Sequence, residues 1–247
     1  MYKFKRIFVM DLLNLFTNPM WLAYATVFPA ALILILGFLG SGSYGAAVTS
    51  YDYYGVAMML YGIFNAATFS ANSFMEERIK SPNMRIVYSP VRPWFIHFSK
   101  VLATSVFCAV TYLFVAALLH FVVGINYGGA DAWAPFAIML AGNFFFSTLG
   151  VLVCCILKSE GTTNNILSLL FTLLALLGGV FFPVDGLGKA VAAASWASPA
   201  KWILTACLRI IYDKDFSMLL PVCGLLVILS AASVVLCSRF FKGEDYI

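Results

Sequence analysis

The chain has 247 residues, of which 62% are hydrophobic and only 11% charged, and its mean hydropathy is +0.94. An ordinary soluble domain carries about 25% charged residues, so a soluble globular protein is excluded. The formal net charge of +4 is modest and gives no indication of a nucleic-acid partner. Several apolar runs approach the roughly 20 residues that cross a bilayer, and we therefore expect a polytopic membrane protein.

Cysteine and histidine usage indicates neither a metal centre nor nucleophilic catalysis. The six cysteines form no metal-type CxxC pair, and most fall inside apolar runs, where a free thiol behaves as a small buried hydrophobe. His97 and His120 are the two histidines and lie 23 residues apart, which excludes a His-rich metal site. We predict no catalytic, metal-binding or cofactor-binding residue on this chain.

Residues 1–19 are too polar to cross a membrane and predict a helix on its surface. At 100° per residue the polar and apolar side chains separate onto opposite arcs. These arcs hold Lys3, Arg6, Asn14 and Thr17 on one side, and Phe4, Phe8, Leu12 and Leu15 on the other. Asp11 falls on the apolar side, which lipid would disfavour, so we expect it to pair with a basic neighbour.

Six apolar runs of about spanning length follow, at residues 21–39, 53–72, 101–123, 133–157, 166–182 and 218–237. Between the last two, residues 183–217 are too apolar for an exposed loop and are divided by Pro183 and Pro199. We predict two short re-entrant or interfacial helices there, anchored by Trp196 and Trp202. The expected fold is an all-α polytopic membrane protein with six transmembrane helices, forming one domain over residues 1–247.

A charged segment at residues 73–100 separates the second and third runs. It holds five of the fifteen Lys and Arg residues, together with Glu76 and Glu77. If the N-terminus lies inside the cell, eleven of the fifteen cations are inside, and the other four all fall in residues 183–217. The positive-inside rule therefore places both termini and the charged segment in the cytoplasm, and residues 183–217 outside.

The motifs for hydrolysing ATP or a peptide bond are missing from the sequence. Gly188-Lys189 is followed by Ala190, and Pro183 stands where a phosphate-binding loop needs its first Gly. Glu76-Glu77 begins an EExxxR-like pattern of membrane proteases, but Ser81 replaces the Arg. If ATP drives this protein, another chain must bind it.

Two predicted spans carry polar side chains along one face. Amides in a bilayer need a partner or a water-filled path, and small residues let helices associate closely. These faces therefore predict a substrate pathway or a subunit interface, or else hydrogen bonding between helices of the same chain. The residues are Tyr54, Met58, Tyr61, Asn65, Thr68 and Asn72 in the second run, and Asn165, Ser168 and Thr172 at the start of the fifth run and within it. A shorter stripe in the fourth run, Asn143, Ser147, Gly150 and Cys154, predicts packing within the chain.

In this order, the features resemble the permeases of type-2 ABC exporters, a family that includes drug, bacteriocin and polysaccharide export subunits. Three features carry the resemblance. The first is acid and base just after the second run, then Ser89-Pro90-Val91, then Lys100. The second is Gly178-Gly179-Val-Phe-Phe-Pro183 ending the fifth run, with Ser198-Pro199 and a helix to Arg209 beyond it. The third is the order itself, a surface helix and six spans with a broken segment before the last.

The resemblance implies a permease that exports an amphipathic small molecule, peptide or lipid-linked glycan across the cell membrane. It would pair with a second copy or a sister permease, and with a cytoplasmic ATPase subunit that binds ATP and Mg²⁺. The charged segment would form a coupling helix docked into that ATPase. The implied contacts are Glu76, Glu77, Arg78, Lys80 and Arg85.

The sequence leaves two other functions open. A non-transporting immunity or sensor subunit could use the same fold. An ion-coupled carrier would usually need acids embedded in the membrane, whereas Asp11, Asp52 and Asp131 lie at the edges of apolar runs or in loops.

Overall fold

A computed structural model describes residues 2–42, 44–45, 48–75 and 94–241, and its regular secondary structure in these ranges is helical. The long helices are α1 (Tyr2–Thr17), α2 (Pro19–Leu39), α3 (Ser50–Met75), α5 (Trp94–Val123), α6 (Trp133–Leu157), α7 (Glu160–Gly178) and α10 (Leu219–Phe240). The short elements are 3₁₀ turns at Gly129–Asp131 and Asp185–Leu187, helices α8 (Lys189–Ser195) and α9 (Pro199–Leu208), and a π-helical turn at Arg209–Asp213.

The expected class, an all-α polytopic membrane protein, is confirmed. Five of the described helices are long and apolar enough to cross a membrane: α2, α5, α6 with the 3₁₀ turn before it, α7 and α10. Helix α3 has 26 residues, about 39 Å at 1.5 Å per residue, but is more polar. It packs against α2, α5, α6, α7 and α9, and nearly all its residues are buried. Because protein rather than lipid surrounds α3, it can be of spanning length without being strongly apolar.

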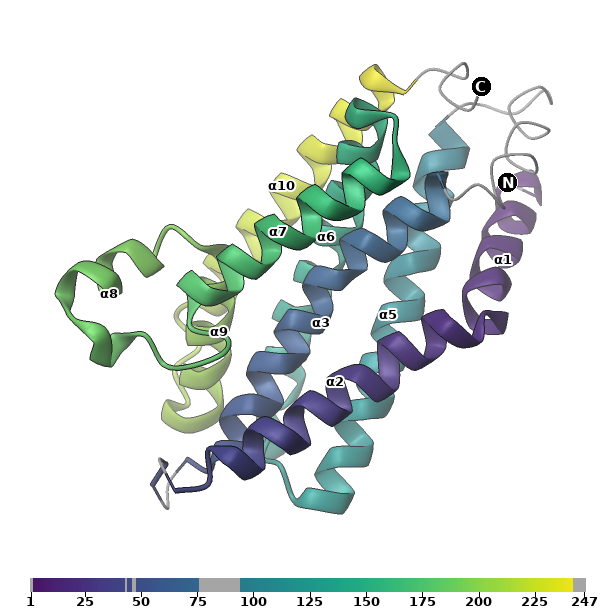
Figure 1. Cartoon of the computed structure of the whole chain (residues 1–247). Helices are drawn as coiled ribbons and strands as arrows, with labels where there is room; N and C mark the ends of the chain where they lie inside the picture. The colour runs from purple at the N-terminus through teal and green to yellow at the C-terminus, as the bar shows by residue number, and fades with distance from the viewer. Residues whose placement is uncertain (1, 43, 46–47, 76–93, 242–247) are drawn as a thin grey trace.

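The long helices run up and down the bundle (Figure 1). Helix α1, the end of α3, the start of α5, the connection from α6 to α7 and the end of α10 lie at one end, here called the α1 end. The end of α2, the connection from α5 to α6, and α9 lie toward the other, here called the α9 end. The first described helix and the end of the last one therefore lie at the same end of the bundle.

The boundaries of α7 differ from those expected. It begins at Glu160 rather than residue 166, because the Ser159 hydroxyl caps it by accepting a hydrogen bond from the Thr162 backbone N–H at 3.4 Å. It ends at Gly178 rather than residue 182, because Gly179 takes the left-handed conformation with φ of 81°. The third predicted span also begins earlier, since α5 starts at Trp94.

The broken segment forms two short helices, α8 and α9, as expected. Ser198 caps α9, and Pro199 occupies its first turn, where a missing backbone N–H costs nothing. The indole nitrogen of Trp202 donates to the backbone carbonyl of Trp196 at 2.8 Å, which ties the two helices together.

Helices α3 and α6 approach each other closely in the bundle core. The Ser70 hydroxyl donates to the Ser147 carbonyl at 2.6 Å. A Cβ atom added to Gly150 would lie 2.0 Å from the carbonyl oxygen of Ala67. The prediction that the stripe on the fourth run packs within the chain is confirmed, because Asn143, Ser147, Gly150 and Cys154 are all buried.

We predict that Gly150→Ala lowers stability by about 1–3 kcal/mol, because the added methyl group pushes α3 and α6 apart. The matched control is Gly161→Ala in the first turn of α7, where an added Cβ has no atom within 4 Å. The measurement is the unfolding midpoint of the detergent-solubilised protein on heating. Equal midpoints for the two variants would contradict the close contact.

Candidate functional site

The residues predicted to contact an ATPase, Glu76, Glu77, Arg78, Lys80 and Arg85, lie outside the described residues. The helices on either side of them are described. Helix α3 ends at the buried Met75, and α5 begins at Trp94. Both of these helix ends lie at the α1 end of the bundle (Figure 1). Any displacement applied between them therefore reaches α3 and α5 directly through the chain.

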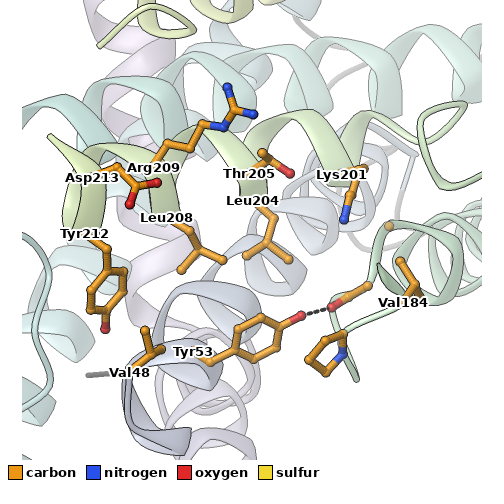
Figure 2. Close-up of a pocket in the computed structure, with 13 residues that line it drawn as sticks. Val48, Tyr53, Val184, Lys201, Leu204, Thr205, Leu208, Arg209, Tyr212 and Asp213 are labelled. Carbon is orange, nitrogen blue, oxygen red and sulfur yellow. Dashed lines mark hydrogen bonds between the residues drawn. The ribbon is translucent and has the colours of Figure 1, made fainter. Parts of the chain in front are cut away.

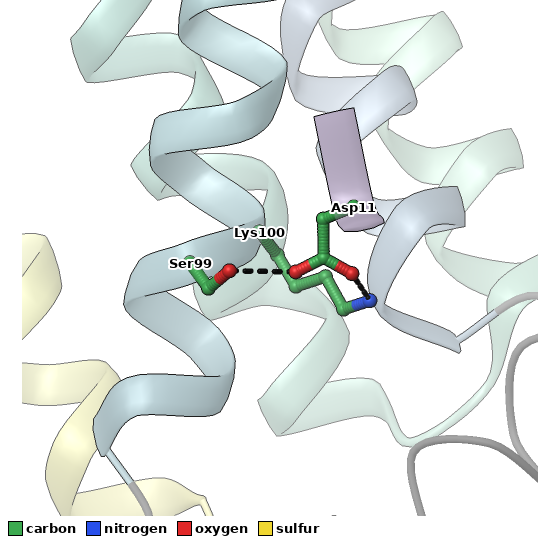
Figure 3. A network of polar contacts seen from close by, with 3 residues as sticks. All are labelled: Asp11, Ser99 and Lys100. Carbon is green, nitrogen blue, oxygen red and sulfur yellow. Dashed lines mark hydrogen bonds and ion pairs between the residues drawn. The ribbon is translucent and has the colours of Figure 1, made fainter. Parts of the chain in front are cut away.

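A buried ion pair joins α1 to α5 at this end (Figure 3). The Asp11 carboxylate binds the Lys100 ammonium and also accepts a hydrogen bond from the Ser99 hydroxyl at 2.6 Å. Asp11 is 8% exposed and Lys100 only 2%. The expectation that Asp11 pairs with a basic residue is confirmed. Lys100 differs from what its place in the charged segment suggested, because it lies inside α5 and is not available at the surface.

Aromatic packing reinforces the joint between α1 and α5. The ring of Phe4 lies among those of Trp94, Phe95 and Phe98 at centroid distances of 5.3–6.2 Å. Phe4, on the apolar face predicted for the first helix, therefore packs against protein. The ion pair and the ring packing together hold α1 against the first turns of α5.

The predicted polar face of α3 divides into buried and half-buried residues. Tyr54, Met58 and Asn72 are buried. The Tyr54 hydroxyl donates to the Phe181 carbonyl at 3.1 Å, and the Asn72 amide oxygen accepts from the Asn164 amide at 2.6 Å. These polar groups are therefore satisfied by the segment that contains α7 and the residues just after it.

Three residues of this face, Tyr61, Asn65 and Thr68, are only half-buried. The Asn65 amide donates to the Tyr61 carbonyl at 3.2 Å, and its oxygen accepts from the Tyr24 hydroxyl of α2 at 3.5 Å. In Figure 1, α3 is seen between α2 and α7 on the near side. The assignment of Tyr61, Asn65 and Thr68 to a substrate pathway or a subunit interface stays a prediction.

The polar residues of α7 lie nearer the surface. Asn165 and Ser168 are exposed, whereas Thr172 is half-buried and donates to the Ser168 carbonyl at 2.8 Å. Farther along the helix Ala175 is buried, so the exposed part of the stripe covers the half nearer the α1 end. An exposed amide and hydroxyl on a helix apolar enough to span a membrane favour a protein or water neighbour over lipid.

A cavity of about 330 Å³ lies near the α9 end, between the first turn of α3, the end of α7, and α9 (Figure 2). The Tyr53 hydroxyl donates to the Gly179 carbonyl across one wall. Leu204 and Leu208 extend from α9 toward it, and the buried Lys201 also lines it. Sequence reasoning missed this site. The sequence feature that could have indicated this site is the pair Tyr53 and Tyr54 at the start of α3, because two adjacent hydroxyls at a helix end need hydrogen-bond acceptors.

One residue that lines this cavity, Arg209, forms an ion pair, and a second ion pair lies close by in the chain. Arg209 lies 3.7 Å from Asp215, and Lys214 lies 2.9 Å from Asp131. Hydrogen bonds from Ser217, and then the charge of Arg209, hold the pKa of the Asp215 carboxyl below its usual range. Burial, aided by the nearby Asp52 carboxylate, raises the pKa of Tyr212, so this phenol is neutral at physiological pH.

The bundle of helices long and apolar enough to span a membrane, with α1 held to α5 by the buried ion pair, defines a polytopic membrane protein. The profile of the ABC-2 type transporter family matches residues 2–212. The chain therefore belongs to the ABC-2 type transporters and is a membrane permease of that class. A comparison with curated protein sequences gave no match.

We predict that Lys100→Met destabilises the protein by about 3–5 kcal/mol, because it leaves the Asp11 carboxylate buried without a counter-charge. The double variant Asp11→Leu/Lys100→Met removes both charges and should recover much of that loss. The measurement is a double-mutant cycle of unfolding free energies in detergent. Strictly additive effects of the two single variants would contradict a direct pairing.

Proposed function

We propose that this permease is the membrane subunit of an ATP-driven exporter, powered by an ATPase subunit on a separate chain that docks at the α1 end. The observation that carries the proposal is the buried Asp11–Lys100 pair. It fixes α1 to α5 just where the charged segment enters the membrane domain. A displacement of that segment would therefore move α1 and α5 together. It would also move α3, because the segment begins at the end of α3.

The distribution of charge supports docking in the cytoplasm. Lys3, Lys5, Arg6, Lys158 and Arg239 are exposed at the α1 end. At the α9 end, Arg209 and Lys214 lie in ion pairs with aspartates. The positive-inside rule expects the face that carries more cations to be the cytoplasmic one. Both chain ends would then be cytoplasmic, in the cell membrane, with α8 and α9 on the outside.

Export would follow the face of the bundle where α3 lies between α2 and α7. Polar side chains there, Tyr61, Asn65 and Thr68 on α3 and Ser168 on α7, suit an amphipathic small molecule, peptide or lipid-linked glycan. A second copy or a sister permease against this face would enclose the path. The partner ATPase would bind ATP and Mg²⁺, and this chain would bind no cofactor.

Reversing the charge at Arg78, Lys80 and Arg85 together should abolish co-purification of the ATPase that accompanies the wild-type permease. The physical reason is the loss of complementary charge at the docking surface. The measurement is recovery of the ATPase after affinity capture of the permease from detergent extracts, with the permease checked for a monodisperse elution profile.

The matched control reverses three cations at the α9 end, Lys189, Arg209 and Lys214, all of them exposed. Breaking surface pairs there costs little, about 0–1 kcal/mol each, and should leave the complex intact. Retention of the ATPase by the Arg78/Lys80/Arg85 variant would show that these residues do not couple the two subunits.

A cysteine at Ser168 should cross-link two permease chains on mild oxidation in membranes, because a two-fold interface brings equivalent positions of α7 together. The control is Val227→Cys on α10, where Val227 is 57% exposed on an apolar face. The measurement is the mass of the cross-linked product. A product of twice the mass of the chain indicates two copies of this chain in contact through α7, whereas equal cross-linking at both positions would contradict this interface.

A further inference from the structure

Two cysteine side chains from different helices contact each other near the α1 end of the bundle. The sulfur atoms of Cys155 on α6 and Cys237 on α10 lie 3.4 Å apart, and the two residues are only 1% and 3% exposed. Other buried thiols are placed differently, since the sulfur atoms of Cys154 and Cys207 each lie 3.9 Å from a backbone carbonyl oxygen. Cys155 and Cys237 therefore differ from thiols that only fill space, because two thiols in contact can react with each other.

The packing of α10 against α6 brings these two residues to the same level of the bundle. Both helices end at the α1 end, and they pack along each other (Figure 1). Cys155 lies two residues before the end of α6, and Cys237 lies three residues before the end of α10. The buried side of α10 carries small side chains here, at Ser230, Ser233 and Cys237, which let two helices approach closely. The contact between the thiols therefore follows from the register of two packed helices.

Only a small movement separates this contact from a covalent bond. The two sulfur atoms are 3.4 Å apart and a disulfide bond is about 2.05 Å long, so each atom has to move by roughly 0.7 Å. A small rotation about the Cα–Cβ bond of each residue produces such a displacement. Of the reactions open to two adjacent thiols, metal binding requires charged thiolates, whereas a disulfide carries no charge. Apolar surroundings favour the uncharged product.

We propose that Cys155 and Cys237 are a site of oxidative modification, at which a hydroperoxide joins the two thiols into a disulfide that fastens α6 to α10. One thiol reduces the hydroperoxide to an alcohol, or to water, and becomes a sulfenic acid. The other thiol then attacks that sulfur, the S–S bond forms, and the hydroxyl group leaves with a proton as water. The two sulfur atoms lose two electrons, and the O–O bond of the hydroperoxide gains them and breaks.

The surroundings of the pair determine which of the two steps is slow. A thiolate rather than a thiol attacks a peroxide, and apolar surroundings disfavour a charged sulfur, so formation of the sulfenic acid limits the rate. The second step is fast because the other thiol is already in contact. The pair lies within one turn of the two helix ends, where Lys158 and Arg239 are exposed, so a small hydroperoxide has a short distance to cross. Neither step requires export or an ATPase partner.

The test exposes the full-length chain in phosphatidylcholine nanodiscs to hydrogen peroxide or to cumene hydroperoxide, which partitions into lipid. The remaining thiols are blocked with N-ethylmaleimide, and peptides are compared by mass spectrometry with and without reduction. We expect a linked peptide that joins Cys155 to Cys237 and is lost on reduction, at least about tenfold more abundant than any other cysteine pairing. Its formation with hydrogen peroxide alone indicates an oxidant from the water phase, and with cumene hydroperoxide alone an oxidant from the bilayer.

Two variants separate the pair from the adjacent thiol. Cys237→Ala should lose the linked peptide, whereas Cys154→Ala, which changes the buried thiol next to Cys155 in the sequence, should retain it. The mapping of the wild type requires no variant, so the test stays decisive if Cys237→Ala does not fold. Absence of the linked peptide after both oxidants, other pairings of equal abundance, or its loss in a folded Cys154→Ala would each overturn the proposal.

Discussion

The burial of Asp11 against Lys100 is the constraint that determines how the helices are arranged at the α1 end of the molecule. Two charges removed from water are stable only while they face each other, so α1 must stay in register with α5. A helix that merely floated on the membrane could not carry a carboxylate on its apolar side. Because of Asp11, the amphipathic helix α1 is a fixed part of the bundle. It is held against α5, the helix that follows the charged segment.

Helix α3 is held in an equally definite way, by neutral hydrogen bonds rather than by charge. Near the α9 end, Tyr53 and Tyr54 donate to backbone carbonyls at and just after the end of α7. Near the α1 end, the amides of Asn72 and Asn164 bind each other. Helices α3 and α7 are therefore fastened at both ends. These hydrogen bonds hold α7 in a fixed position relative to α3.

Much of this arrangement was predictable from the sequence. The apolar runs located the spans because length and hydropathy in a bilayer are set by its thickness. The need of Asp11 for a cation followed from its position on the helical arc. The identity of that cation did not, since Lys100 is 89 residues away and belongs in sequence to the charged segment. The start of α7 was missed because Thr and Asn are weak helix formers, whereas the Ser159 cap and tertiary packing outweigh that weakness.

Helical periodicity identifies a polar face but not what covers it. The residues of α3 illustrate the limit: Asn72 and Tyr54 meet partners within the chain, while Tyr61 and Asn65, on the same face, remain half-buried. Asn143 shows the converse. The stripe that contains it packs within the chain as expected. Of the two polar atoms of its amide, however, only the nitrogen finds a hydrogen-bond partner in that packing, and the oxygen finds none among the described residues.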